Sequence, residues 1–441
     1  MGNNSDSQSS GARGVLGVPT LAISCAVVMA LMIGGAIIAS HSSASGTPST
    51  TVTATSQRGS TKPHDSKHRD SRPPAPLRVA SVVPFPGASS VGWRSDVTVR
   101  YNEPITAASL MPMIRPAVAG SWDRVGPETV VFRPTTQWVP FVQETVIVPK
   151  DSRSTDGTTL GQSSISTFTV AGASALRLQE LLAELGYLPV AFTPKGGAVP
   201  APVTGVRTRP TPPFTHPSSA PASTATTVVA APGPGTTRDI EPSVPGDIPR
   251  EALAGRFAWR FTNIPTSLAD EWTAGSSNEV TTGAVMAFES ANGLPDDGVA
   301  GPAVWQALLQ AAASRKITAA PYDYVYVSEG SPEYVTIWRD GVNVFTTLAN
   351  TGIPQAPTVA GTWPVYVRYT VTTMSGTNPD GSTYSDPGIP WVSYFHGGDA
   401  LHGYLRSQYG FPQSLGCVEM PYSSADTVFP YTPIGTLVTV E

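Results

Sequence analysis

The sequence predicts a multidomain protein with an N-terminal transmembrane helix, an all-β sandwich, a small α-helical domain carrying an insertion, and a C-terminal mostly-β domain. Three observations support this fold class. Residues 14–39 carry no charged side chain. Short apolar runs between turn residues recur over 77–172 and again after residue 322, as expected of strands. A helical period of leucines lies between these two regions and predicts a change to helix.

The uncharged segment 14–39 is long enough to cross a bilayer, which takes ~20 apolar residues. Arg13 precedes it and the next basic residue is Arg58, so residues 1–13 are expected in the cytoplasm. The chain is thus predicted to be a single-pass cell membrane protein whose larger part lies outside the cell; the alternative is a signal peptide cleaved near residues 42–44. Residues 40–76 are rich in Ser, Thr and Pro without apolar period and predict a disordered stalk.

Composition argues against a nucleic-acid partner. The net charge is −5 and only 13% of the residues are charged, well below the ~25% of typical globular proteins. A nucleic-acid-binding domain would need a basic surface, and the sequence offers none.

Residues 77–172 are predicted to form the all-β sandwich. The strands expected there are 78–83, 96–101, 129–132, 145–148 and 166–170. This pattern resembles the bacterial immunoglobulin-like modules that precede cell-wall enzymes. Trp93, Trp122 and Trp138 are expected to pack in or beside its core, and the module to act as a spacer.

Residues 173–315 are predicted to form the helical domain. Leu178, Leu181, Leu182 and Leu185 lie on one helix face, which Gly186 closes. A second helix, a glycine-rich turn and a third helix follow over 282–309. This order resembles the peptidoglycan-binding domain type 1, interrupted here by a Pro- and Thr-rich insertion at about 198–247, with residues 251–277 packing back on the helices. A helical spacer without ligand is the alternative.

Residues 322–441 are predicted to form a compact mostly-β domain. Apolar runs alternate with turns, and Asp340-Gly341 between two of them indicates a hairpin. Residues 374–390 and 404–413 are polar and predict two long loops of the kind that cover binding sites.

A lone cysteine marks the chemistry of this domain. The chain has two cysteines, and Cys25 lies in the apolar N-terminal segment, so Cys417 has no disulfide partner in a folded domain. His402 lies fifteen residues before it, and a cysteine with a nearby imidazole is the minimal set for thiol nucleophilic catalysis. His396 is the other histidine of this domain and either lies in a glycine loop, lines the cleft or takes the role of His402 as base.

The order of motifs here resembles the L,D-transpeptidase catalytic domain, the YkuD fold. The motifs are His402-Gly403, Ser414-Leu415-Gly416-Cys417-Val418 and Gly435-Thr436-Leu437-Val438. The resemblance implies Cys417 as nucleophile, His402 as base and the Gly403 carbonyl as the group that orients the ring.

The residues around the cysteine predict its supporting groups. Backbone N–H groups of Leu415, Gly416 and Cys417 would form an oxyanion hole. Ser414 would either hydrogen-bond in the cleft or stabilise the turn. Many family members have histidine in place of Leu415 and Asn or Arg in place of Glu419. Glu419 is expected to be a solvated surface carboxylate, and the alternative is a carboxylate that favours an amine-bearing substrate.

Three residues are predicted to contact substrate, namely His396, Tyr384 and Arg406, the last through a substrate carboxylate. The resemblance implies a cell-wall enzyme that forms 3→3 peptidoglycan cross-links through a cysteine acyl-enzyme. It needs no metal and no cofactor, binds peptidoglycan stem peptides and glycan, and is inhibited by carbapenem-type β-lactams. Two alternatives stay open, an L,D-carboxypeptidase using the same site and a non-catalytic peptidoglycan-binding protein.

Overall fold

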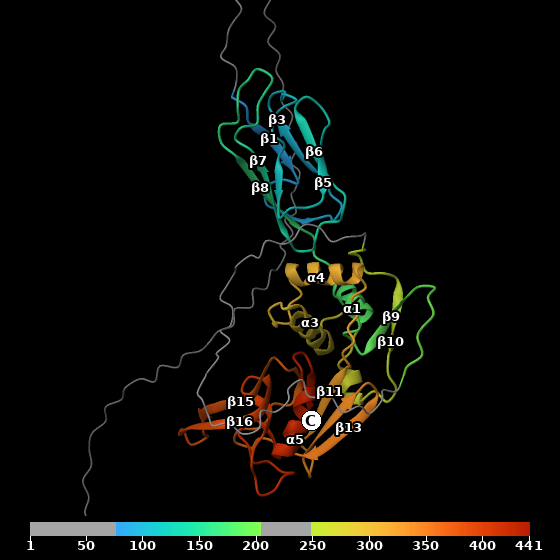
Figure 1. Ribbon diagram of the computed structural model, residues 1–441, viewed down its shortest axis with the longest axis vertical. Helices are drawn as coiled ribbons and strands as arrows, with labels where there is room; N and C mark the ends of the chain where they lie inside the picture. The colour runs from blue at the N-terminus through green and yellow to red at the C-terminus, as the bar shows by residue number, and fades with distance from the viewer. Residues whose placement is uncertain (1–75, 204–247) are drawn as a thin grey trace, which may run out of the picture. The chain divides into compact units, whose positions relative to one another are not determined.

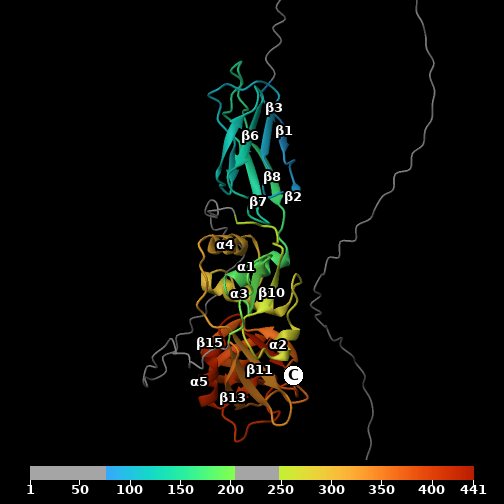
Figure 2. The same ribbon diagram turned by 90° about the vertical axis from the view of Figure 1, so that its right-hand side faces the viewer.

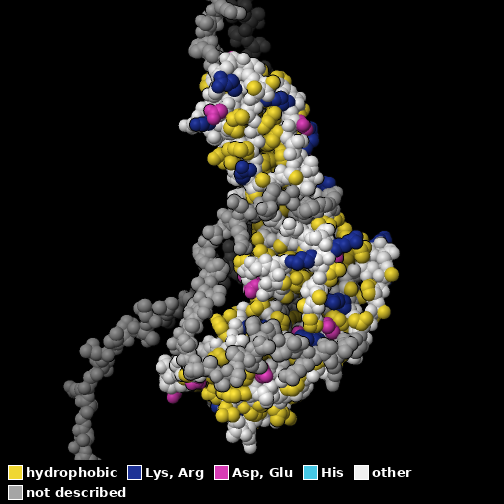
Figure 3. Space-filling view, viewed as in Figure 1, with side chains coloured by type: hydrophobic (Ala, Val, Ile, Leu, Met, Phe, Trp, Pro, Cys, Tyr) yellow, Lys and Arg dark blue, Asp and Glu magenta, His cyan; other side chains and the backbone are white. Residues whose placement is uncertain are grey.

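A computed structural model describes residues 76–203 and 248–441 (Figures 1 and 2). The predicted anchor 14–39, the stalk before residue 76 and most of the insertion lie outside the described residues. Among the described residues, no helix combines the length and the apolar character that a membrane crossing requires. On the face shown in Figure 3, charged side chains are scattered among hydrophobic and uncharged ones.

Residues 76–172 form two four-stranded sheets around one core. One sheet has the order β1-β3-β6-β5 and the other β2-β8-β7-β4. The strands are β1 (Val79–Val83), β2 (Ala88–Val91), β3 (Val97–Tyr101), β4 (Met113–Arg115), β5 (Gly120–Arg124), β6 (Thr129–Pro134), β7 (Gln143–Val148) and β8 (Ser164–Val170). The five strands predicted from the sequence are all present. The sequence missed β2, β4 and β5, because these are short and mostly exposed.

The core of this β unit is built by alternation along its strands. In β7, Glu144, Val146 and Val148 point inward together, at 2%, 0% and 1% exposure. Trp138 is fully buried, with its ring centroid 5.9 Å from Phe132 and 5.5 Å from Phe168. The other two tryptophans of this unit, Trp93 and Trp122, pack against the same core, so the predicted packing role is confirmed.

The helical module begins at Ser174, whose hydroxyl accepts a hydrogen bond from the Arg177 N–H and caps the first helix. Its elements are α1 (Ala175–Glu184), β9 (Val190–Pro194), β10 (Gly255–Trp259), α2 (Thr266–Asp270), α3 (Glu279–Asn292) and α4 (Pro302–Ala313). Strands β9 and β10 pair antiparallel, so the two sides of the insertion lie next to each other. Phe257 of β10 lies 5.1 Å from Phe192 and 5.3 Å from Trp272, which confirms that the segment after the insertion packs back on the module.

The helical module shares its core with the C-terminal domain. Leu181, Val285 and Trp305 from the helices belong to the same buried cluster as Tyr324 and Trp338 of the following sheet. The Tyr324 hydroxyl donates to Ser267 Oγ at 2.7 Å. The Trp338 indole donates to the Asn263 carbonyl at 2.9 Å. These contacts join the two parts of the chain into one packed body.

The C-terminal domain contains a five-stranded sheet of order β13-β12-β11-β19-β14 and a four-stranded sheet of order β15-β16-β17-β18. The elements are β11 (Asp323–Ser328), β12 (Tyr334–Arg339), β13 (Val342–Leu348), β14 (Gly361–Pro364), β15 (Val367–Thr377), β16 (Thr383–His396), β17 (Asp399–Gly403), β18 (Val418–Met420), α5 (Tyr422–Val428), a 3-10 turn (Phe429–Tyr431) and β19 (Leu437–Val440). A buried cluster with residues of both sheets forms the core. The predicted hairpin turn is present, with positive φ at Asp340 and Gly341.

The prediction of a long loop at 374–390 was wrong. This segment belongs to a long hairpin, in which β15 pairs antiparallel with β16 from Val367↔Tyr394 to Thr377↔Thr383. The sequence does not indicate these strands for two reasons. β15 is exposed along most of its length, so no apolar alternation marks it, and Pro387-Gly388 within β16 is a pair of residues that usually marks a break. The predicted loop at 404–413 is irregular in the structure.

Candidate active site

The candidate site is positioned by the parallel pairing of β17 with β18. His402 is the register partner of Glu419, and Leu401 that of Val418. Leu401 and Val418 belong to the buried cluster between the two sheets, whereas Ala400 and Cys417 belong to the cluster on the opposite face. Because side chains alternate between the two faces, His402 lies on the same face as Cys417. The two residues are diagonal neighbours on adjacent strands, within the reach of a ring side chain.

His402 is held as a neutral base. Its side chain is only 3% exposed, and its Nδ1 lies 3.1 Å from the Gly403 carbonyl oxygen. This contact requires the proton on Nδ1, so Nε2 is left with a free lone pair. Burial lowers the pKa of His402, which favours the neutral ring at neutral pH. The ring of Tyr404 stands edge-on at 6.0 Å. The Gly403 carbonyl therefore lies where the resemblance placed it.

Cys417 is a protonated thiol in the resting site. The residue is partly accessible, and its Sγ lies 3.6 Å from the Gly398 carbonyl oxygen. Close packing around the sulfur, together with the negative charges of Asp399 and Glu419, raises the pKa of Cys417 to about 12, and a hydrogen bond from the Ala400 backbone lowers it only in part. Forming the thiolate therefore requires a base that takes the proton during attack.

The turn before Cys417 is built by Ser414 and Gly416. The Ser414 hydroxyl donates to the Cys417 carbonyl and accepts from the Gly416 N–H at 3.2 Å. Of the two roles considered for Ser414, its contacts are those of a turn-stabilising hydroxyl. Gly416 has φ +111, and a side-chain carbon there would overlap Asp399 Oδ1, so only glycine fits. Leu415 is half-buried at the same turn.

Arg406 and Glu419 form an ion pair beneath the histidine. Glu419 is 4% exposed, so the expectation of a solvated carboxylate was wrong. The Arg406 guanidinium donates to both of its carboxylate oxygens, at 2.7 and 2.8 Å, and lies 4.7 Å above the Tyr404 ring. The guanidinium that was predicted to meet a substrate carboxylate thus meets Glu419 of the chain itself. The negative charge of Glu419 raises the pKa of His402 and the positive charge of Arg406 lowers it.

Several tyrosine side chains lie near Cys417. Tyr384, predicted to contact substrate, lies close enough to Cys417 for their charges to interact, and burial raises the pKa of its phenol. The charges of Tyr394 and Tyr366 also interact with that of Cys417. Burial raises the pKa of Tyr394 to about 12. Tyr366 and Tyr394 were not predicted from the sequence; Tyr394 lies in β16 and Tyr366 directly precedes β15.

His396 and Asp399 face each other across the turn between β16 and β17. His396 Nδ1 lies 3.8 Å from Asp399 Oδ2, and the His396 ring stacks on Trp363 at 4.2 Å. The sequence analysis missed Asp399, although its position directly after Gly397-Gly398 and two residues before the buried Leu401 marks it as a strand-end polar group.

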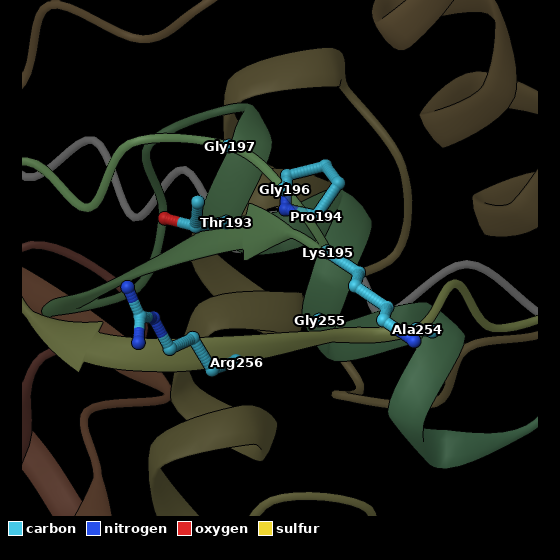
Figure 4. A pocket seen from close by; sticks show the side chains of 8 residues that line it. All are labelled: Thr193, Pro194, Lys195, Gly196, Gly197, Ala254, Gly255 and Arg256. Atoms are coloured by element: carbon cyan, nitrogen blue, oxygen red, sulfur yellow. The ribbon is translucent and has the colours of Figure 1, made fainter.

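The surface has two hollows that Cys417 does not line. One of about 290 Å³ borders Tyr404, the neighbour of His402, and is lined by Asp386, Pro387, Gly388, Ile389, Tyr404, Leu405 and Tyr422. Another of about 490 Å³ lies on the β9–β10 ribbon and is lined by Thr193, Pro194, Lys195, Gly196, Gly197, Ala254, Gly255 and Arg256 (Figure 4). Its two cationic side chains extend away from each other, and none of its residues belongs to the candidate site.

Residues 322–440 match the family model described as the L,D-transpeptidase catalytic domain, YkuD. The C-terminal domain is an L,D-transpeptidase domain. The chain therefore has a cell-wall L,D-transpeptidase function. Residues 268–308 match the family model described as a putative peptidoglycan binding domain, which covers α3 and parts of α2 and α4.

Several solved L,D-transpeptidases resemble the chain at low similarity. An L,D-transpeptidase from Mycobacterium smegmatis is 13% identical, covering 83% of this chain and 100% of that one at a TM-score of 0.24. L,D-transpeptidase 3 from Mycobacterium tuberculosis, in complex with a faropenem-derived adduct, is 13% identical. The match covers 82% of this chain and 97% of that one, at a TM-score of 0.25. The catalytic domain of the E. faecium L,D-transpeptidase is 26% identical. The match covers 28% of this chain and 100% of that one, at a TM-score of 0.26. TM-scores this low add nothing to the family match. No curated protein matches the chain.

Proposed function

We propose that the L,D-transpeptidase domain forms 3→3 peptidoglycan cross-links through a thioester on Cys417. The observation that carries this is the placement of Cys417 and His402 on one sheet face, with Nδ1 of His402 engaged by the Gly403 carbonyl. The resting pair is a neutral thiol and a neutral imidazole. Attack on a carbonyl is therefore coupled to transfer of the thiol proton to Nε2 of His402.

The reaction runs in two acyl-transfer steps. The sulfur of Cys417 attacks the carbonyl of the third, diamino-acid residue of a tetrapeptide stem. His402 takes the thiol proton and passes it to the terminal D-alanine amine as that group leaves. The side-chain amine of a neighbouring stem then attacks the thioester, and the thiol is restored. The Glu419 carboxylate, register partner of His402, favours the imidazolium that forms in each step.

The remaining parts of the chain deliver this domain to its substrate. Residues 14–39 would hold the chain in the cell membrane, with the enzyme on the cell-wall side. Residues 77–172 would act as an immunoglobulin-like spacer, which their two sheets around one core support. The module that includes 268–308 would bind peptidoglycan glycan, as the family match supports.

Mass spectrometry of the full chain tests the chemistry. A carbapenem, the inhibitor class expected from the family, should add its mass to Cys417, and the adduct should be lost in Cys417→Ser and slowed at least ~100-fold in His402→Gln, the contribution typical of a general base. With purified muropeptides, a cross-linked dimer supports transfer and a shortened monomer supports the carboxypeptidase alternative. A thiol that stays unlabelled in the folded chain would favour a non-catalytic wall-binding protein.

A further inference from the structure

A second imidazole, that of His396, lies two residues before the carbonyl that contacts the thiol. Cys417 contacts the Gly398 carbonyl, and Gly398 lies in the short turn that joins His396 to Asp399. The His396 side chain is 34% exposed, whereas His402 is almost fully buried. His396 is therefore the more solvent-accessible of the two imidazoles.

Asp399 connects this imidazole to the nucleophile turn. One of its oxygens lies directly against Gly416, and the other accepts the Val359 N–H at 3.1 Å and faces His396 Nδ1. The His396 ring is fixed by Trp363, whose indole nitrogen donates to the Val359 carbonyl at 3.3 Å. The carboxylate is thus held beside the sulfur, and its charge is felt there, because it raises the pKa of Cys417.

A carboxylate beside a nucleophilic thiol opposes the first reaction step, since it disfavours the thiolate. Its placement suits the second step, in which the attacking group is a primary amine. Such an amine is cationic at neutral pH and must lose a proton before it can attack. A carboxylate attracts the ammonium, and an adjacent imidazole can accept the proton. The charge of Asp399 acts on the titratable groups of Cys417 and Tyr366, and His396 is the partly exposed base that faces this carboxylate.

We propose that His396 and Asp399 form the acceptor site of the enzyme, which binds an aliphatic primary ammonium and deprotonates it. This inference rests on the proposed thioester mechanism and extends it to the second substrate. Asp399 binds the ammonium and orients His396, and His396 accepts the proton. The ligand class is a side-chain amine of a diamino acid.

The acceptor ammonium gives one proton to His396, and the free amine attacks the thioester carbonyl. The new C–N bond forms, His402 takes the second proton from nitrogen, and the C–S bond breaks. The thiolate recovers that proton from His402, and His396 releases the first proton to solvent. The net products are the amide, the thiol and one proton.

Separate measurement of the two half-reactions tests the proposal on the full chain. Carbapenem labelling of Cys417 reports the first step, and dimer formation from muropeptides with a diamino-acid acceptor reports the second. In His396→Gln, labelling should stay within about twofold of wild type, and in Asp399→Asn it should be no slower than wild type, because loss of the carboxylate charge favours the thiolate. In both variants dimer formation should fall at least ~100-fold, the lower end of a general-base contribution. Asp399→Asn should also raise the KM for the acceptor. Asp380→Asn, at the exposed hairpin tip, is the matched control and should leave both rates unchanged.

Hydroxylamine distinguishes a proton acceptor from a structural residue. It is uncharged at neutral pH, so it should release the thioester at similar rates in His396→Gln and in wild type, and the dimer rate of His396→Gln should recover as the pH is raised. Dimer formation at the wild-type rate in both variants overturns the proposal. Equal loss of labelling and dimer formation also overturns it, because it assigns the pair to the first step. If wild-type protein itself forms no adduct on Cys417, the thioester mechanism is what has failed.

Discussion

The contact between the helical module and the L,D-transpeptidase domain can be tested with one methyl group. Gly283 lies within α3, and a side-chain carbon at that position would stand 2.5 Å from the Gly435 carbonyl oxygen and 3.0 Å from Leu437 Cδ2. A carbon on Gly435 would in turn overlap the Gly283 carbonyl. The two backbones therefore touch where the module meets the turn before β19. The perturbation is Gly283→Ala.

Two opposing effects set the magnitude. In an isolated helix, alanine in place of interior glycine stabilises by roughly 0.5–1 kcal/mol. Inserting a methyl group into a closely packed contact costs about 1–3 kcal/mol. The cost of crowding the contact should outweigh the gain in helix propensity, so the free energy of unfolding should fall by about 1–2 kcal/mol. This corresponds to a fall of roughly 2–8 °C in Tm for a body of this size. The sign is therefore opposite to what helix propensity alone predicts.

Thermal and urea unfolding of the full chain provide the assay, with Gly435→Ala and Gly381→Ala as companions. Gly435 and Gly381 have nearly the same φ, +86 and +88, but a side chain on Gly381 would meet no atom within 4 Å. Both variants bear the backbone cost of alanine at positive φ, so the extra loss in Gly435→Ala measures the contact. A Gly283→Ala protein that is more stable than wild type would refute the close docking of module and enzyme.

Further predictions concern charge and the shared core. Glu419→Gln should move the acidic limb of the pH profile for carbapenem labelling to lower pH and Arg406→Met to higher pH, because the Glu419 charge raises the pKa of His402 and the Arg406 charge lowers it. Each variant should also lose about 1–3 kcal/mol in urea unfolding, since the pair is 6% exposed on one side and 30% on the other. Burial raises the pKa of Glu144 to about 8, so the folded chain keeps a proton that the unfolded chain releases above ~4.5. Stability of the β unit should therefore fall as pH rises from about 5 to 8, and Tm measured across this range should become flat in Glu144→Gln. A fragment of residues 322–441 exposes the part of its core that packs on the helical module, so calorimetry should give it a lower Tm than the full chain.

The sequence predicted the parts of this protein that depend on local pattern. The leucine face of α1, the Asp340-Gly341 turn and the strands of the first β unit follow from periodicity and turn chemistry, which neighbouring residues alone determine. The pairing of His402 with Cys417 came from family resemblance. Periodicity could not supply it, because β17 and β18 are five and three residues long and are joined by an irregular crossover.

The charge partners around the site could not be predicted from the sequence for a different reason. Glu419 and Arg406 are thirteen residues apart, and only the return of the crossover to β18 brings them together. From the sequence alone, a glutamate next to Val418 is expected to be a surface group, because the neighbouring strand is not known. The same holds for Asp399, whose role depends on Gly416 approaching from another element. Long-range electrostatics is thus the property that local pattern misses.

The crossover itself explains how the site keeps its register. A slip of one residue between β17 and β18 would move His402 to the opposite sheet face from Cys417. The crossover is tied to the strands it joins: Arg406 binds Glu419, and the Tyr409 hydroxyl donates to the Tyr404 carbonyl at 2.6 Å. The N–H of Gly410 donates to Asn350 Oδ1 at 3.0 Å, which fastens the same segment to the residues that follow β13. Because a slipped strand would leave the buried Glu419 without its arginine, the ion pair penalises the inactive register, and the distance in sequence between histidine and cysteine matters less than the anchoring of the chain between them.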